Sequence, residues 1–226
     1  MTKDFKKRFD AVAARALGEL LPGERGAISY SAELSAFMRF NGGKVRQSGS
    51  VEQADLSIKL WKGAKTYSFL LALSGDEAED DERVAEAVGK ARALMPLLPD
   101  DPYQAVPEAA GSSDARYSGS LLPEAEIPAR VLGPAAGLDF TGVYSQGLVC
   151  RGAANSAGAR HWFQTETFLV DYSAWLPNGR AVKSSYAGRE WSDAEYAKRI
   201  AATKRSLENL GVEQIALEPG KYRAFI

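Results

Sequence analysis

The sequence contains very little of the residue types that build disulfides and metal centres. Among its 226 residues there are one cysteine, Cys150, and one histidine, His161. A single cysteine cannot form an internal disulfide, so we expect Cys150 to be a small buried hydrophobe rather than a reactive thiol. A single histidine cannot supply the usual ligands of zinc, and its neighbours Arg160 and Trp162 are typical of an ordinary strand position. We therefore predict that this chain has no catalytic residue and no metal ligand.

The sequence also lacks an excess of charge and any long apolar run. Its 28 basic and 29 acidic residues give a formal charge of -1, which provides no global field toward nucleic acid or an anionic membrane. No segment approaches the ~20 apolar residues that span a bilayer, and residues 1–9 are charged without the apolar stretch of a signal peptide behind them. We expect a cytoplasmic protein that binds neither nucleic acid nor membrane.

What is present is the composition of a globular protein, with 45% hydrophobic and 25% charged residues. Apolar residues recur at steps of three and four from Phe5 to Leu20, and Pro22-Gly23 follows, which predicts an amphipathic first helix. From residue 26 to residue 73 the apolar residues alternate in short runs, which indicates strands. Turns at 41–44 and 62–63 favour an antiparallel meander, followed by a helix whose start carries the acidic run 76–82.

The second half of the chain repeats this order after a different kind of segment. Residues 96–134 carry seven of the ten prolines and predict a connector that lies over the surface. Strands are predicted at 138–151, 162–172 and 181–186, with a hairpin turn at Pro177-Asn178-Gly179. Ser192 and Glu195 have the spacing of a capping box, which predicts the start of a helix that Gly211 ends.

These patterns predict an α+β protein with two pseudo-repeated units of antiparallel strands followed by a helix, plus an amino-terminal helix. Segments 36–94 and 143–207 share this order, which suggests internal duplication, with chance similarity of two α+β units as the alternative. The predicted organisation is an amino-terminal helix and first unit at 1–95, the proline-rich connector at 96–134 and a second unit at 135–211. The final segment, 212–226, ends in residues 222–226, which have the composition of a strand.

Other catalytic arrangements find little support. Pairing His161 as a base with Cys150 or Ser156 rests on sequence proximity alone. Glu166 and Asp171 could form an acid-base pair, but they lie at strand positions where solvation or ion pairing is expected.

Several short motifs resemble the amino-terminal region of the TldD/PmbA family, whose members are also called modulators of DNA gyrase. The first is Arg39-Phe40-Asn41, followed by Val45 and by the strand at 56–58 with Gly63. The second is Asn155-Ser156-Ala157-Gly158, which is similar to an Asn-Ser-x-Gly turn of the family and precedes a strand and a helix. The third is Pro219-Gly220-Lys221-Tyr222. Their order covers most of the chain.

The resemblance implies a region that confines unfolded peptides in a zinc metallopeptidase and can form homo- or heterodimers. The family carries zinc in its carboxy-terminal part on a His-Glu-x-x-x-His helix, which this sequence lacks, so the chain is predicted to hold no cofactor and to be inactive alone. The resemblance implies that residues 212–226 are the start of a truncated or absent carboxy-terminal domain. That missing half, or a partner subunit, would supply the metal. By analogy, Arg39, Asn41, Asn155, Ser156 and Gly158 are the candidate substrate-binding residues, each of which could instead only stabilise a turn or an ion pair.

Two alternatives to that function remain. The chain could be a self-standing, non-catalytic module that binds peptides by strand pairing and docks on a catalytic partner. It could also be an unrelated small-molecule-binding domain, for which a deep closed pocket would be expected.

Overall fold

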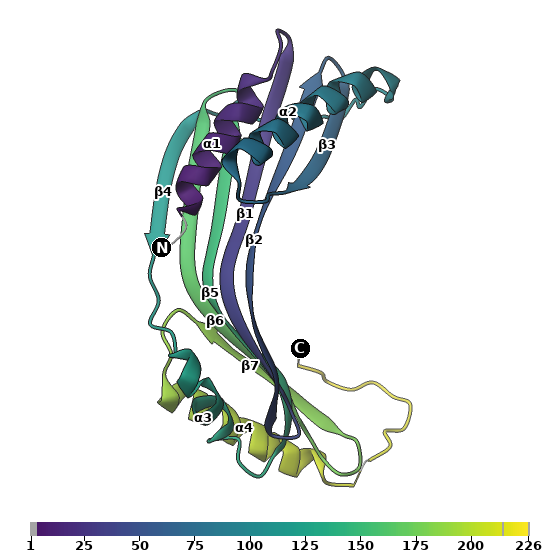
Figure 1. Cartoon of the computed structure of the whole chain (residues 1–226). Helices are drawn as coiled ribbons and strands as arrows, with labels where there is room; N and C mark the ends of the chain where they lie inside the picture. The colour runs from purple at the N-terminus through teal and green to yellow at the C-terminus, as the bar shows by residue number, and fades with distance from the viewer. Residues whose placement is uncertain (1–3, 214, 226) are drawn as a thin grey trace.

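One long, strongly bent sheet carries the whole fold (Figure 1). The computed structural model describes residues 4–213 and 215–225. The four long strands have 17 to 19 residues each, roughly 60 Å when extended, and a twisted sheet of this length bends into an arc. These strands are β1 (Glu24–Asn41), β2 (Lys44–Lys62), β5 (Asp139–Asn155) and β6 (Ala159–Trp175). The shorter strands are β3 (Lys65–Ala72), β4 (Gly111–Tyr117) and β7 (Ala181–Gly188).

The two predicted repeat units are present, and they share this sheet. The strand order is β3-β2-β1-β5-β6-β4, and β7 also pairs with β6. The units are joined by the antiparallel pair β1 and β5, in which Ala27 lies opposite Asn155 and Phe40 opposite Gly142. Each unit also has a helix before its strands and one after them. The helices are α1 (Phe5–Gly18) and α2 (Glu77–Leu94) in the first unit, and α3 (Ile127–Leu132) and α4 (Asp193–Leu210) in the second.

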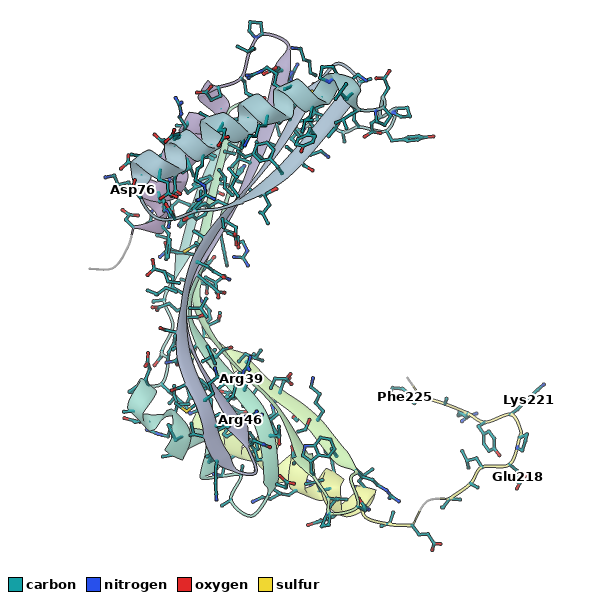
Figure 2. All side chains as sticks on the ribbon, turned by 45° about the vertical axis from the view of Figure 1, so that its right-hand side comes forward. Arg39, Arg46, Asp76, Glu218, Lys221 and Phe225 are labelled. Carbon is teal, nitrogen blue, oxygen red and sulfur yellow. The ribbon has the colours of Figure 1, made fainter. Side chains whose placement is uncertain are left out.

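All four helices cover the same face of the sheet. The residues of β1, β5 and β6 that enter the two hydrophobic cores are all even-numbered, and side chains alternate between faces along a strand. One core lies under α1 and α2 and includes Tyr30 and Trp162, and the other lies under α3 and α4 and includes Phe40 and Tyr172. Figures 1 and 2 show these helices on the convex side of the arc, at its two ends. Within the described residues, the concave face carries no helix.

Local signals place the helix starts where the sequence predicts them. The carboxylates of Asp4 and Asp76 accept hydrogen bonds from the amides of Lys7 and Glu79 at the starts of α1 and α2. At α4, the Ser192 hydroxyl accepts from the Glu195 amide at 3.3 Å.

The capping box predicted at α4 is only half formed. The Ser192 amide donates to the Tyr186 hydroxyl at 3.1 Å instead of to Glu195. The Glu195 carboxylate pairs with Lys198 at 2.6 Å. A buried tyrosine therefore replaces the expected reciprocal contact.

The segment predicted as a surface connector contains a strand and a helix. Strand β4 runs parallel to β6. The sheet is therefore mixed, whereas the sequence predicts only antiparallel strands. Polar Gly111–Tyr117 gives no apolar signal because β4 is held by backbone pairing with little side-chain burial. Before β4, the chain crosses one end of the concave face, where Gln104 donates to the Gly63 carbonyl and Glu108 lies 3.7 Å from Arg25.

The carboxy-terminal segment differs from the prediction. Residues 222–225 form no strand, and residue 226 lies outside the described residues. The segment projects from the end of α4 on the concave side of the arc (Figures 1 and 2), and Leu217 and Phe225 are exposed. These residues form no strand despite their composition because no described strand lies beside them to pair with. No helix in the described part of the chain is long and apolar enough to cross a membrane.

Candidate functional site

The five predicted substrate-binding residues lie in two separate groups at opposite ends of β1. Asn155, Ser156 and Gly158 lie beside the start of β1, since Asn155 is opposite Ala27. Arg39 and Asn41 lie at its other end. Twelve residues of extended strand separate Ala27 from Arg39, which is roughly 40 Å. The five residues therefore cannot contact one small ligand together.

The group at 155–158 forms the turn between β5 and β6. The Asn155 side-chain oxygen accepts from the amides of Ala157 and Ala159, and its nitrogen donates to the Ala109 carbonyl at 2.9 Å. The Ser156 hydroxyl accepts from the Gly26 amide at 3.1 Å, and Gly158 has a φ of +99°, which favours glycine. Asn155 is buried. These contacts make the group a structural element of the turn.

A hollow of about 740 Å³ lies between this turn and the end of α1. The acid that lines it is Glu24, whose carboxylate is bound by the Arg92 guanidinium at 2.9 and 3.0 Å and by the Leu21 amide at 3.0 Å. The hydrogen bond from Arg92 lowers the pKa of Glu24 below its ordinary value. This carboxylate is therefore already paired, and it joins β1 to α2.

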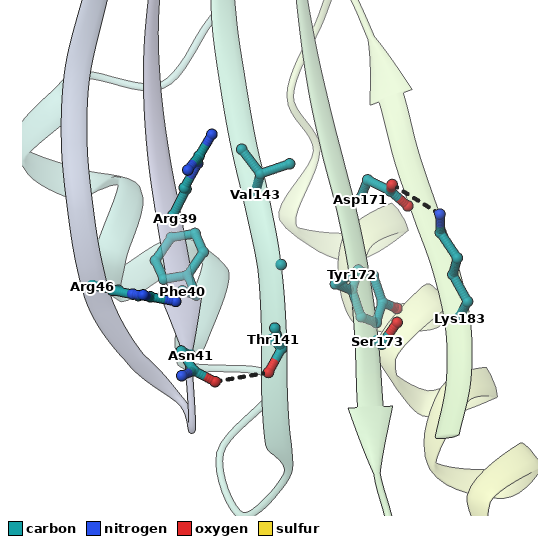
Figure 3. Close-up of a pocket in the computed structure, with 11 residues that line it drawn as sticks. Arg39, Phe40, Asn41, Arg46, Thr141, Val143, Asp171, Tyr172, Ser173 and Lys183 are labelled. Atoms are coloured by element: carbon teal, nitrogen blue, oxygen red, sulfur yellow. Dashed lines mark hydrogen bonds and ion pairs between the residues drawn. The ribbon is translucent and has the colours of Figure 1, made fainter. Parts of the chain in front are cut away.

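The group at the other end opens onto a trough of about 380 Å³ on the concave face (Figure 3). Arg39 and Arg46 stand on its β1–β2 side, and Asp171 and Lys183 stand on its β6–β7 side. The remaining lining residues are Phe40, Asn41, Thr141, Gly142, Val143, Tyr172 and Ser173. The trough is open and shallow, unlike the deep closed pocket expected of a small-molecule-binding domain.

Polar contacts inside the trough leave its two sides with different chemistry. Lys183 Nζ lies 3.1 Å from the Asp171 carboxylate, so these charges balance each other. The Thr141 hydroxyl donates to the Asn41 side-chain oxygen at 3.1 Å (Figure 3). The Arg39 guanidinium lies 5.6 Å from the Phe37 ring centroid, a cation–π distance. Positive charge thus concentrates on the β1–β2 side.

Sequence reasoning missed Arg46 and Lys183 as residues of this trough. Alternation along the strands could have indicated this polar surface, because Arg39 with Asn41 and Asp171 with Ser173 are polar pairs two residues apart and so share a face. Arg46 could not be assigned to a face from the sequence. The β1–β2 register shifts beside it, so that Arg39 is opposite Gln47 while Phe40 is opposite Val45.

The alternative catalytic arrangements are not brought together. Cys150 is buried in the core, and burial raises the pKa of its thiol to about 11. His161 is exposed on β6, where its Nδ1 lies 2.9 Å from the Ser113 hydroxyl on β4. Glu166 accepts from the Gly119 amide, and it lies on the opposite sheet face from Asp171 because the two residues are five positions apart.

Within residues 4–213 and 215–225, no three His, Cys, Asp or Glu side chains are grouped to hold a metal ion.

One edge of the sheet beside the trough is open. β3 pairs only with Asp55–Lys62 of β2, and the Leu73 amide donates to the Ala54 carbonyl. No described strand pairs with residues 44–51 of β2 on the side away from β1. Such an edge presents backbone donors and acceptors from alternate residues and can accept a further strand.

Comparisons with known proteins agree with the fold that the sequence motifs had suggested. No family model and no curated protein sequence matches the chain. Among solved structures, the chain is similar to a putative modulator of DNA gyrase from Thermotoga maritima, with a TM-score of 0.59 and 18% identity over 90% of this chain and 48% of that one.

Two further structures show the same relationship. TldE from Thermococcus kodakarensis gives a TM-score of 0.61 and 12% identity over 88% of this chain and 47% of that one. A putative modulator of DNA gyrase from Bacteroides thetaiotaomicron gives a TM-score of 0.62 and 14% identity over 95% of this chain and 52% of that one. The chain therefore spans about half the length of the structures it matches and has the fold of their amino-terminal halves. The predicted resemblance is confirmed at the level of fold.

Proposed function

We propose that this chain is the cytoplasmic, amino-terminal, substrate-confining region of a TldD/PmbA-like zinc metallopeptidase that acts on unfolded peptides. The observation that supports the proposal is a concave sheet face that carries no helix within the described residues and lies beside an open strand edge. The fold is shared with half of longer proteins, TldE and two putative modulators of DNA gyrase. Zinc and the residues that activate water would come from a carboxy-terminal half or from the partner subunit of a homo- or heterodimer.

The open edge of β2 offers a physical mechanism for binding peptides of many sequences. An extended peptide could add to residues 44–51 as a further strand, because main-chain hydrogen bonds recognise the backbone and demand little of the side chains. Its alternate side chains would then lie on the concave face. A folded protein could not present such a free strand, so the mechanism favours unfolded substrates.

Peptides methylated on their backbone amides test this mechanism without altering the protein. A strand added to one edge directs the amides of only every second residue at that edge. We expect a fluorescein-labelled, unstructured ten-residue peptide to bind, as measured by anisotropy. Methylation of every amide should abolish binding, whereas methylation of one alternate set should largely preserve it, because the peptide can turn its unmethylated set toward the edge. Unchanged binding of the fully methylated peptide would exclude strand pairing, and no binding of the parent peptide would overturn the proposed function.

A second function is favoured by the exposed apolar residues after α4. At least 73% of the surface is exposed in each of three apolar residues, Ile215, Leu217 and Phe225. Exposure of apolar surface to water is unfavourable, and burial against a partner would remove this cost. In this function the chain is a self-standing, non-catalytic peptide-binding module that docks on a catalytic partner. Replacing these three residues by serine should leave peptide binding unchanged and abolish co-purification of a peptidase from native extract. Co-purification that is unaffected would contradict docking through this segment.

A further inference from the structure

The trough beside the open edge of β2 has an unbalanced charge. Arg39, Arg46 and Lys183 line it, and Asp171 is its one acidic lining residue. The chain as a whole has a formal charge of -1, so the local balance is opposite in sign to that of the molecule. Positive charge in a hollow of a near-neutral protein raises the local concentration of anions.

The donors on the β1–β2 side are available to a ligand. Asp171 is 3.1 Å from Lys183, across the trough from the arginines. Among residues 4–213 and 215–225, no carboxylate forms an ion pair with Arg39 or Arg46. Because the Thr141 hydroxyl occupies the Asn41 side-chain oxygen, the Asn41 side-chain nitrogen keeps its N–H donors for another partner. This side of the trough therefore offers two guanidinium groups and an amide as N–H donors to a ligand.

The backbone explains why Arg46 points into the trough. Arg46 is the extra residue where the β1–β2 register shifts between Arg39 and Phe40, and such an irregularity redirects a side chain. Figure 3 shows Arg46 directed toward the trough from β2. β2 is also the strand with the open edge, so a peptide added there would place side chains of the concave face roughly 5 Å from those of β2.

We propose that Arg39 and Arg46 bind a carboxylate of the extended peptide, so that this region selects acidic substrates. The inference rests on the proposed peptide-binding function and adds a substrate class to it. Guanidinium groups bind carboxylates through paired, charge-assisted hydrogen bonds. The carboxylate could belong to a glutamate or aspartate side chain or to the carboxy terminus of the peptide, and these two sources share the same chemistry.

Four labelled peptides separate the sources. They are otherwise identical and carry glutamate or glutamine at the central positions, each with a free or an amidated carboxy terminus. We expect a carboxylate to tighten binding roughly tenfold at low salt, and less at high salt because exposed ion pairs are screened. Tighter binding of the glutamate peptides than of the glutamine peptides would identify a side-chain carboxylate as the bound group. Tighter binding of the peptides with a free carboxy terminus than of the amidated ones would identify the terminal carboxylate.

Four protein variants locate the effect. Arg39→Gln and Arg46→Gln should each reduce the preference for carboxylate peptides, and the double variant should remove it while neutral peptides still bind. Arg25→Gln is the matched control, because Arg25 also lies on the concave side of β1 but at its opposite end, beside Glu108. It should keep the full preference. Circular dichroism melts confirm that each variant is folded.

The possible results separate this inference from the function on which it rests. Equal affinity for all four peptides, or a preference that survives in the double variant, would overturn the carboxylate site and leave peptide binding intact. Failure of every peptide to bind would overturn the proposed function itself. A preference lost in the double variant and kept in Arg25→Gln would support both.

Discussion

The Arg8 guanidinium and the Asp80 carboxylate lie 3.0 Å apart although 72 residues separate them in the chain. Arg8 belongs to α1 and Asp80 to the first turn of α2, so the pair joins the two helices that cover one end of the sheet. The Asp80 side chain is 2% exposed and also accepts from the Ser74 amide at 2.7 Å and the Gly75 amide at 3.1 Å. Every one of these partners is a donor, so the site requires a charged carboxylate.

Replacement of this carboxylate should destabilise the protein. Asp80→Asn leaves Arg8 without its counter-charge in a largely buried position, and loss of one partner of a buried pair costs about 3 kcal/mol. Urea unfolding at pH 7 measures the change in the free energy of unfolding. The control is Asp10→Asn, since Asp10 forms an exposed pair with Lys6 and should change stability by less than about 0.5 kcal/mol. Equal effects of the two substitutions would contradict the assigned role of Asp80.

The same carboxylate predicts how stability depends on pH. Burial by itself raises the pKa of Asp80, but hydrogen bonds from Ser74, Arg8 and Gly75 together lower it below its ordinary value. A group whose pKa is lower in the folded state contributes stability above its unfolded pKa, about 3.9, and loses it as pH falls through the folded pKa. The difference between wild type and Asp80→Asn should therefore be constant near neutral pH and shrink below about pH 4. A difference that grew in acid would show the opposite sign of the pKa shift.

Asn155→Ala should lower stability more than it alters peptide binding. The side chain holds the β5–β6 turn through Ala157 and Ala159 and joins it to Ala109 ahead of β4. Loss of this side chain leaves buried backbone groups unpaired, which should lower the free energy of unfolding by about 2 kcal/mol. Thermal melts and peptide anisotropy together test this. Asn178→Ala is the control, because Asn178 accepts one bond from Arg180 in an exposed turn. A fully stable Asn155→Ala that had lost binding would make Asn155 a binding residue.

The middle of the sheet depends on a glycine. A Cβ on Gly147 of β5 would lie 2.2 Å from the Leu34 carbonyl oxygen and 2.6 Å from the Ser35 Cα, both on the neighbouring strand β1. Gly147→Ala must therefore shift the two central strands apart, and we expect a loss of about 3 kcal/mol. Gly89→Ala in α2 meets nothing within 4 Å and should stabilise the helix by roughly 0.5–1 kcal/mol. Urea unfolding of both variants compares them, and a harmless Gly147→Ala would disprove the close approach of β1 and β5.

The isolated chain should contain no stoichiometric zinc and cleave no peptide, because its one histidine cannot complete a zinc site. Elemental analysis, with a peptidase assay run with and without chelator, measures both properties. The peptide used for anisotropy serves as substrate, so binding and cleavage are compared on the same molecule. Zinc together with chelator-sensitive cleavage would make this chain an enzyme in its own right.

The sequence by itself determined the local structure and the repeat. Alternating apolar residues gave the strands, Asp76 and Ser192 marked helix starts, and the glycine turn after Asn41 joined β1 to β2, because each of these signals acts between residues close in the chain. The order of elements also predicted the two units. Strand β4 escaped detection because a polar edge strand depends on a partner distant in sequence.

Only the tertiary structure decided which residues share a surface. It separated Asn155 from Arg39 by the length of β1, and it brought Arg46 and Lys183 onto the trough that Arg39 lines. Sequence alternation fixes two faces for each strand, but strand order, register and the shift beside Arg46 decide which faces meet. These depend on pairing across more than 100 residues, as between β1 and β5, which no local pattern encodes.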